Sequence, residues 1–414
     1  MSGNDEASLP EPDVERAARA AAGWYPDPFG VQLWRWYDGT SWTSFASGDS
    51  SAGRTAARSP RLPRFLSPPV LVCGILTALM LLVIAADSPW SIIAGLVPLL
   101  IVLPVLSWLD RVEPEPRSSK VHAILWGACV AIVVALVVNS IVGLMFGEVV
   151  AMVGSAPLVE EGAKALGVVW AVRRRDIDSV TDGIVYAGWV AIGFAVVEDI
   201  TYFAVADVEG ALLPVFVLRA LLTPFAHPLF TFWTGLAIGR AVRQRRPIWP
   251  SALWGFGLAV ATHAAWNGSL ALSDVTYNVD EDVGTTVVLV AMAVFFVIFV
   301  AVAATLIVMR GRERERFVAR VPSRVLRYNI APGEAAMFVG GWRHLLAERR
   351  QLSRGSRPTF DRLHASLARL SLLHERPGEV DAAEQRLLED RLSDAVAAFR
   401  SVDRHPGPHQ QRRS

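Results

Sequence analysis

Long apolar stretches alternate with short polar junctions over the middle of this 414-residue chain. About 20 helical residues are needed to cross the hydrocarbon core of a bilayer, and eight stretches approach or exceed that length. They run near Pro69–Ala86, Trp90–Leu109, Val121–Phe146, Val149–Val172, Val180–Ala206, Leu212–Gly239, Trp249–Leu272 and Thr285–Met309. The pattern predicts an all-α polytopic membrane protein with about eight transmembrane helices.

The charges at the junctions predict the orientation of these helices. Arginine clusters precede the first stretch and follow the second, fourth, sixth and eighth. The alternate junctions contain only acidic charges, namely Asp87, Glu148, Asp207, Glu209, Asp274, Asp280, Glu281 and Asp282. Because positively charged loops stay in the cytoplasm, both termini are expected there, in agreement with an even number of crossings.

The flanks of the apolar core have different patterns. Residues 1–20 are expected to be disordered, and residues 46–66, rich in Ser, Ala, Arg and Pro, to form a flexible linker. The core is expected to cover residues 67–309. Residues 310–414 are expected to form a helical cytosolic tail, because apolar residues recur every three or four positions from Phe360 to Leu373.

Composition agrees with a membrane protein. Hydrophobic residues make up 52% of the chain, and charged residues make up 19%, below the roughly 25% of soluble domains. The mean hydropathy is +0.36. A net charge of +1 gives no indication of a nucleic-acid partner. Cys73 and Cys129 both lie in apolar stretches, which argues against a disulfide framework or a cysteine zinc site.

Ionisable residues interrupt the fourth stretch, which contains Glu160, Glu161 and Lys164. A charged side chain at mid-membrane costs about 2.5–3.5 kcal/mol on the insertion scale, so three together indicate a function. The next three stretches also contain polar residues: Glu198, then His227, then His263 with Asn267. At about 1.5 Å per residue, these positions lie at similar depths and are expected to converge.

Helical spacing separates the expected roles of these residues. Either glutamate can pair with Lys164, at i+4 or i+3, while neighbouring residues diverge by about 100°. One glutamate is therefore expected to bind the lysine while the other faces a cavity. His263 and Asn267 lie on one helical face and are suited to orient a carbonyl group or a water molecule. Each feature alone is compatible with helix packing, but their convergence favours a functional site.

Several intramembrane chemistries lack their residues in this sequence. No H-E-x-x-H zinc motif is present, and no G-x-S-x-G motif occurs in an apolar stretch. No apolar stretch contains a Gly-Asp pair of the aspartyl intramembrane protease kind, and the sequence lacks a D-D-x-x-D motif. Serine, aspartyl and diphosphate-metal mechanisms are therefore not indicated.

The polar residues fall in four short motifs that resemble those of a known family. The motifs are Glu160-Glu161-Gly162-Ala163-Lys164 (E-E-x-x-K), Phe194-Ala195-Val196-Val197-Glu198 (F-x-x-x-E), Ala226-His227-Pro228-Leu229-Phe230 (A-H-x-x-F) and His263-Ala264-Ala265-Trp266-Asn267 (H-x-x-x-N). In this order they resemble the PrsW family of intramembrane proteases, relatives of the CAAX-protease and bacteriocin-processing superfamily. The resemblance covers roughly Pro69–Met309. CAAX-processing relatives have histidine where this chain has Glu198.

The resemblance implies a metalloprotease site. It favours zinc bound by Glu198, His227 and His263, with Glu160 or Glu161 taking a proton from the attacking water. Lys164 and Asn267 complete the expected catalytic set. In a metal-free alternative, one glutamate activates water together with a histidine, and His263 and Asn267 stabilise the oxyanion.

The expected function is hydrolysis of a peptide bond in or next to the membrane. The resemblance implies regulated proteolysis, with a membrane-spanning or membrane-adjacent protein as substrate and the cell membrane as location. A proton-coupled transporter would also use buried carboxylates and histidines, although such proteins normally have internal repeats, and none is visible here. A non-enzymatic membrane scaffold is the remaining alternative.

Aromatic residues alternate near the N-terminus, around Asp38-Gly39, and predict a small β-rich module over residues 21–45 with a tight turn. The segments Gly23–Pro28 and Leu33–Thr43 are similar to DUF2510, a tryptophan-rich domain of many actinobacterial membrane proteins. Cytosolic proteins are candidate partners for this module and for the C-terminal tail.

Overall fold

The computed structural model describes residues 23–26, 32–37, 42–49, 66–327, 338, 342–373 and 382–403. The chain divides into two compact units, residues 1–63 and residues 64–414. The segment predicted to be disordered, 1–20, lies outside the described residues, as does most of the predicted linker.

Three strands form an antiparallel sheet in the first unit. They are β1 (Gly23–Pro26), β2 (Gln32–Tyr37) and β3 (Trp42–Asp49), paired in the order β1-β2-β3. Trp24 is opposite Trp36, and the pairing of β2 with β3 shifts register between Arg35 and Tyr37. The predicted turn at Asp38-Gly39 falls between β2 and β3, outside the described residues. β3 continues to Asp49, beyond the end predicted for the module at residue 45.

The second unit is helical in its described residues. The first helices are α2 (Pro68–Asp87), α3 (Pro89–Gly95), α4 (Val97–Leu109), α5 (Arg117–Leu125), the π-helical segment η2 (Trp126–Ala131) and α6 (Ile132–Phe146). Next come α7 (Glu148–Val150), the π-helical segment η3 (Ala151–Ser155), α8 (Ala156–Arg173) and α9 (Val180–Val208). They are followed by α10 (Leu212–Phe216), the π-helical segment η4 (Val217–Leu222), α11 (Ala226–Arg243), α12 (Ile248–Tyr277) and α13 (Glu281–Arg327).

Among the described residues, six helices are long and apolar enough to cross a membrane. They are Pro68–Asp87, Pro89–Leu109, Arg117–Phe146, Val180–Val208, Leu212–Arg243 and Glu281–Val318. The other two predicted crossings are also helical, as α7–α8 and as α12. These two contain Glu160, Glu161, Lys164, His263 and Asn267, so the polar residues themselves reduce the apolar character of these helices.

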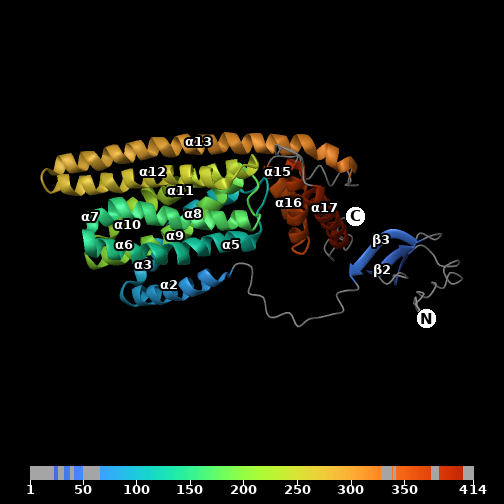
Figure 1. Cartoon of the computed structure of the whole chain (residues 1–414), viewed down its shortest axis with the longest axis horizontal. Coiled ribbons are helices and arrows are strands. Elements are labelled where there is room, and N and C mark those ends of the chain that lie inside the picture. The colour runs from blue at the N-terminus through green and yellow to red at the C-terminus, as the bar shows by residue number, and fades with distance from the viewer. Residues whose placement is uncertain are drawn as a thin grey trace, which may run out of the picture. The chain divides into compact units, whose positions relative to one another are not determined.

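Helix α9 is by far the most buried of these six helices, and 89% of the residues in its apolar stretch are buried. A capping box starts it: the Ser179 hydroxyl accepts from the Asp182 amide, and the Asp182 carboxylate accepts from the Ser179 amide. Glycines allow α11 to approach closely, since a Cβ atom at Gly183 would lie 2.3 Å from the carbonyl oxygen of Gly235. Helix α9 packs mainly against α11, α3, α5, α8 and α4, and Figure 1 shows it within the helical core.

Two breaks in the helices direct the chain toward the site. Gly147, at φ 93°, ends α6 and lets the chain turn back into α7 and α8, because a residue without a Cβ adopts this conformation at little cost. Pro224 follows η4 and interrupts the long predicted stretch Leu212–Gly239 at residues 223–225. Helix α11 therefore begins at Ala226, with His227 in its first turn.

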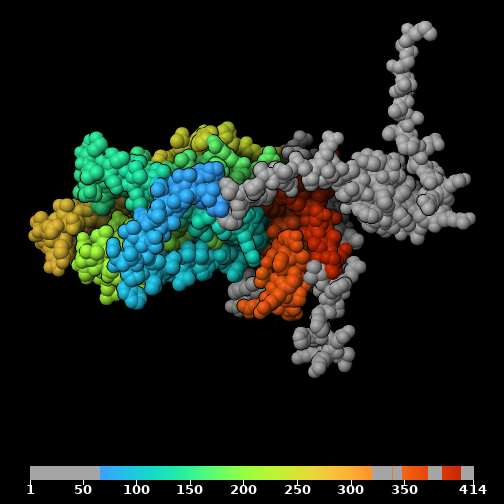
Figure 2. Space-filling model, turned by 90° about the horizontal axis from the view of Figure 1, so that it is seen from below, coloured from blue at the N-terminus to red at the C-terminus, as the bar shows by residue number. Residues whose placement is uncertain are grey.

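Three C-terminal helices follow the core: α15 (Trp342–Gln351), α16 (Arg357–Leu373) and α17 (Ala382–Asp403). Apolar residues of α16 and α17 form a second hydrophobic cluster that includes Phe360, Leu392 and Phe399 and also takes in Phe317 from α13. Figure 2 shows α16 and α17, in orange and red, beside the teal part of the helical core. Arg369 of α16 bonds Glu115, in the loop between α4 and α5, at 2.8 and 2.9 Å.

Candidate active site

Four helices bring the predicted site residues into one buried cluster. Helix α8 carries Glu160, Glu161 and Lys164, α9 carries Glu198, α11 carries His227 and α12 carries His263. Glu161 and Lys164 are fully buried, and the other members of the cluster are at least largely buried. The structure thus brings together six of the seven residues singled out in the sequence.

Lys164 lies at the centre of this cluster. Its Nζ atom is 2.9 Å from Glu161 Oε1, 3.6 Å from Glu160 Oε2 and 2.9 Å from His227 Nδ1. The ammonium group also lies 3.9 Å from the ring centroid of Phe194, a cation–π contact. Because an ammonium group can only donate, His227 Nδ1 accepts from Lys164, and the ring proton of His227 is on Nε2. That Nε2 lies 2.7 Å from Glu198 Oε2 and donates to it.

Glu161 has hydrogen-bond partners on both carboxylate oxygens. Oε1 accepts from Lys164 and lies 3.2 Å from Nδ1 of His263, while Oε2 accepts from the Thr231 hydroxyl at 2.8 Å. His263 therefore carries its proton on Nδ1, which leaves the lone pair of Nε2 available. The His263 ring also stacks on Phe230 at a centroid distance of 4.4 Å. Glu161 is thus arranged to hold Lys164 and His263 in place.

Glu160 has a different environment from its neighbour. Its Oε1 accepts from the Asn139 amide at 3.4 Å, and the Asn139 carbonyl accepts from the Ser155 hydroxyl at 2.8 Å. Its Oε2 is buried without a hydrogen-bond partner among the described residues, 3.9 Å from His263 Nε2. A buried polar atom without a partner requires an explanation such as a water molecule, a proton or an ion. Of the two glutamates, Glu160 therefore presents the free oxygen.

The donor atoms near this free oxygen suit a metal ion. Ligand atoms of Glu160, His227 and His263 lie within 4.8 Å of one another. Two imidazoles and one carboxylate form the His₂Glu donor set of several catalytic zinc sites. Glu198, predicted as a third ligand, lies outside this group, and its Oε2 accepts from His227 and from Arg219. His227 would have to release Lys164 or Glu198 to bind an ion.

Comparisons with known proteins agree with the four motifs. The family described as "PrsW family intramembrane metalloprotease" matches residues 115–302, which contain every residue of the cluster. The "Protease PrsW" of Geobacillus kaustophilus (strain HTA426) is 33% identical over 172 residues, which cover 40% of this chain and 74% of that protein. The chain belongs to the PrsW family of intramembrane proteases.

Further matches extend this assignment. The "Protease PrsW" of Clostridioides difficile (strain 630) is 29% identical over 154 residues, which cover 34% of this chain and 64% of that protein. Residues 22–54 match DUF2510, a family described only as a protein of unknown function. No solved structure matches.

Asn267 is the one predicted site residue that does not lie in the buried cluster. Its amide nitrogen donates to the carbonyl oxygen of Met152 at 2.9 Å, within the π-helical segment η3. A π-helical turn leaves backbone groups in irregular positions, and Asn267 satisfies one of them. The contact joins α12 to the start of α8, so Asn267 supports the helix that carries Glu160.

Three polar residues of the site were not identified from the sequence: Asn139, Ser155 and Thr231. Asn139 is an amide in a mostly apolar stretch, and this was the signal available for it. Thr231 follows His227 by four residues and therefore shares its helical face. Ser155 gave no such signal, because serine occurs often in membrane helices.

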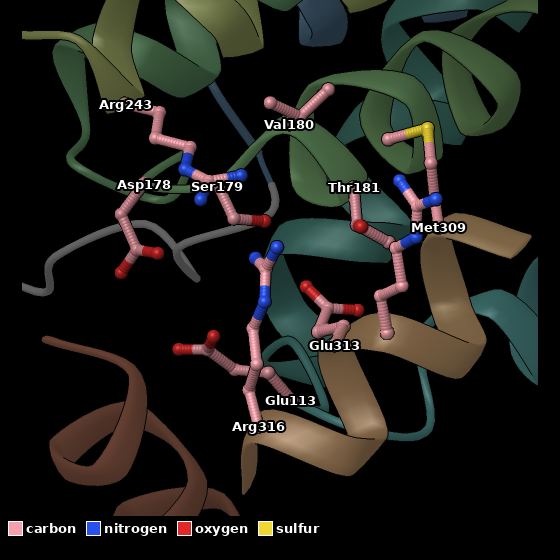
Figure 3. Close-up of a pocket in the computed structure, with 10 residues that line it drawn as sticks. Glu113, Asp178, Ser179, Val180, Thr181, Arg243, Met309, Glu313 and Arg316 are labelled. Atoms are coloured by element: carbon pink, nitrogen blue, oxygen red, sulfur yellow. The ribbon is translucent and has the colours of Figure 1, made fainter. Parts of the chain in front are cut away.

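A cavity of about 180 Å³ lies outside this cluster, between the start of α9, the end of α11 and residues 309–316 of α13. Figure 3 shows Asp178, Glu313 and Arg316 among the charged groups that line it. Thr181 of this cavity lies about 25 Å along α9 from Glu198, at 1.5 Å per residue. The buried Glu113 also lines it, and burial raises the pKa of that carboxyl well above its ordinary value. The cavity is separate from the intramembrane site.

Proposed function

We propose that this protein hydrolyses peptide bonds of membrane-spanning or membrane-adjacent protein substrates, as part of regulated proteolysis in the cell membrane. One observation carries the proposal: the Glu160 Oε2 atom is buried, without a hydrogen-bond partner among the described residues, beside Nε2 of His263. A carboxylate in this position can accept a proton from a water molecule that attacks a carbonyl carbon. Glu161, Lys164 and Glu198 act as its supports, since they fix both imidazole rings.

The proposal includes eight membrane crossings with both termini in the cytoplasm. Helices α7–α8 and α12 would then cross the bilayer beside the six more apolar helices. The arginine clusters that follow α4, α8, α11 and the apolar part of α13 favour this orientation. In this topology the cluster lies within the membrane, where surrounding helices limit the access of water.

The charges of the site favour a bound dication. Four carboxyl groups, on Glu160, Glu161, Glu198 and Asp199, contact two cations, Lys164 and Arg219. With both histidines neutral, four negative and two positive groups give the cluster a net charge of −2. An unbalanced charge is costly away from water, and a divalent ion would neutralise it.

We propose zinc as this ion, with Glu160, His227 and His263 as the residues that would hold it. Glu160 would then serve as a ligand, and its role as proton acceptor belongs to the metal-free alternative. A bound zinc ion lowers the pKa of a water molecule and polarises a carbonyl group. Lys164 would then keep Glu161 ionised and oriented toward His263. In the metal-free alternative, two protons balance the charge, and Glu160 activates water next to the Lys164 ammonium group, which already provides a positive charge 3.6 Å away.

A cleavage assay in proteoliposomes tests the function. A panel of single-span protein substrates is incubated with the parent protein, with Glu160→Gln and with His263→Ala; Glu209→Gln, at an exposed position beyond α9, is the matched control. Loss of the Glu160 carboxylate, as metal ligand or as general base, is expected to lower kcat by at least about 100-fold. The control is expected to cleave like the parent. Equal rates for the parent and Glu160→Gln would refute the proposed function.

Removal of the metal distinguishes the two mechanisms. The purified parent is expected to contain about one zinc ion per chain, to lose activity with a membrane-permeant chelator and to regain it when zinc is added back. Full activity in metal-free protein would instead establish the metal-free mechanism with the same residues.

A further inference from the structure

Arg219 lies behind the site on the π-helical segment η4, directly before the break at residues 223–225. Its Nε donates to Asp199 Oδ1 at 2.6 Å, and its terminal nitrogen donates to Glu198 Oε2. The guanidinium carbon lies 3.9 Å from the ring centroid of Tyr202. Three residues of α9 thus hold the guanidinium in one orientation.

The Glu198 oxygen bonded to Arg219 also binds His227. Glu198 Oε2 accepts from both the guanidinium and Nε2 of His227, and Nδ1 of His227 accepts from Lys164. A continuous series of contacts therefore runs from Asp199 through Arg219 and Glu198 to His227. Carboxylates that bind the outer nitrogen of a histidine fix its tautomer and its orientation.

We infer that Arg219 is a positioning residue of the active site: it holds the Glu198 carboxylate against His227 and thereby fixes the His227 ring with its proton on Nε2. The inference rests on the proposed function. Arg219 does not contact Glu160 or His263 in any hydrogen bond or ion pair found among the described residues, so its influence passes through Glu198.

An arginine suits this role better than a lysine. A planar guanidinium group can donate to two carboxylates at once in fixed directions, whereas an ammonium group is a compact point charge. Glu198 and Asp199 are consecutive on α9 and diverge by about 100°, and Arg219 spans both. The π-helical geometry of η4 adds a residue to the turn and so redirects this side chain relative to a regular helix.

A purely structural ion pair is the competing explanation, and a double-mutant cycle separates the two. Arg219→Gln, Glu198→Gln and the double variant are compared with the parent for kcat, KM and thermal unfolding, and Arg246→Gln, at an exposed position, is the matched control. If Arg219 acts through Glu198, its removal has no further effect once Glu198 is neutral.

The expected result is a 10- to 100-fold loss of kcat in Arg219→Gln, about the size found for residues that support metal ligands. The double variant is expected to match Glu198→Gln within about twofold in kcat/KM. Arg219→Lys keeps the positive charge and is expected to retain part of the activity that Arg219→Gln loses. This variant also provides a test if Arg219→Gln does not fold. Losses that multiply in the double variant, or a loss of stability with unchanged kcat, would overturn the inference.

The histidine tautomer gives a readout that does not depend on cleavage. The ¹⁵N signals of histidine-labelled protein distinguish Nε2–H from Nδ1–H rings, and the His227 signal is assigned by its loss in His227→Asn. The parent is expected to show the Nε2–H form and Arg219→Gln a mixture. If the parent cleaves no substrate, the proposed function fails, whereas an identical His227 spectrum in parent and Arg219→Gln overturns this inference.

Discussion

Lys164 is in contact with both neighbouring glutamates and with one of the two site histidines. Its Nζ lies 2.9 Å from Glu161 and 2.9 Å from His227, and it is fully buried. Charge pairs of this kind contribute little net stability when complete, because desolvation offsets attraction, but the loss of one partner leaves the other charge uncompensated. Lys164 is therefore required for folding of the site as well as for its chemistry.

Lys164→Gln is expected to lower the free energy of unfolding by about 3–5 kcal/mol and to abolish cleavage, because it leaves two buried carboxylates without a cation. Thermal unfolding in detergent at a fixed scan rate measures this effect. Arg349→Gln is the comparison, since it breaks a partly exposed pair with Asp361 and is expected to cost at most about 1 kcal/mol. Equal shifts for the two variants would contradict this account.

Most site residues could be predicted because an ionisable group is conspicuous in an apolar stretch. Glu160, Glu161, Lys164, Glu198, His227 and His263 all gave that signal, and the structure brings them together. Their detailed partners could not be predicted. The depth of a residue follows from the helical rise, but the direction of its side chain depends on helix rotation, which the packing of several helices sets together. Asn267 illustrates this limit, because its amide is directed to Met152.

At the scale of elements, close contact between α9 and α11 holds Glu198 next to His227. A Cβ atom at Gly183 would lie 2.3 Å from the Gly235 carbonyl oxygen, and one at Gly235 would lie 2.4 Å from the Gly183 carbonyl oxygen. Backbone atoms cannot move aside as a flexible side chain can. The spacing between these two helices therefore depends on residues without side chains, as in other membrane helix pairs.

Gly235→Ala is expected to separate α11 from α9, with a destabilisation of about 1–3 kcal/mol and a fall in kcat. Thermal unfolding and the cleavage assay measure the two effects. Gly257→Ala is the matched control, because it is also helical but its added methyl group meets nothing within 4 Å. Because alanine favours a helix more than glycine does, the control is expected to keep or gain stability, and a control that loses as much as Gly235→Ala would contradict the packing explanation.

The irregular parts of the helices were not visible in the hydropathy pattern. Apolar composition indicates that a segment can cross a membrane, but it does not report π-helical turns such as η3 and η4. The break at Pro224 had a visible cause in the sequence, yet the predicted stretch Leu212–Gly239 passed through it. In a membrane protein such irregular backbone is tolerated where it is buried in protein or lines a cavity. Both π-helical turns support the site, through Ser155 and Arg219.

At the scale of the whole molecule, the C-terminal helices contact the end of the helical core through apolar and charged groups. His364 of α16 lies between Phe317 of α13 and Phe338, at centroid distances of 5.8 and 5.7 Å. Burial lowers the pKa of His364 from 6.5 to about 4. For Glu115 the shift is in the opposite direction. Burial raises the pKa of its carboxyl group to about 7, although the bonds to Arg369 act to lower it.

The pKa of His364 predicts that acid destabilises the tail. A histidine with a lowered pKa in the folded state contributes its full stability above pH 6.5, and that contribution falls as the pH decreases toward 4, because the unfolded chain then binds the proton more tightly. The loss is on the order of 2–3 kcal/mol. Hydrogen exchange of α16 peptides in the full chain, at pH 7.5 and pH 5 and corrected for intrinsic rates, measures it.

His364→Phe retains an aromatic ring without a titrating group and is expected to reduce this acid sensitivity. The direction of this pH effect identifies its source. Glu113 and Glu115 have raised pKa values, so their contribution to stability falls as the pH rises, opposite to that of His364. Protection of α16 that falls equally with acid in the parent and in His364→Phe would show that other groups control the contact.

The arrangement of α8 also constrains how the protein is made. Several partners of the charges on this helix, namely His227 and Thr231 of α11 and His263 of α12, follow it in the chain. During synthesis, α8 emerges before these partners, and until then its two carboxylates and one ammonium group have only one another and Asn139 of α6 as partners. The site is complete only once synthesis reaches His263, about a hundred residues after Glu161.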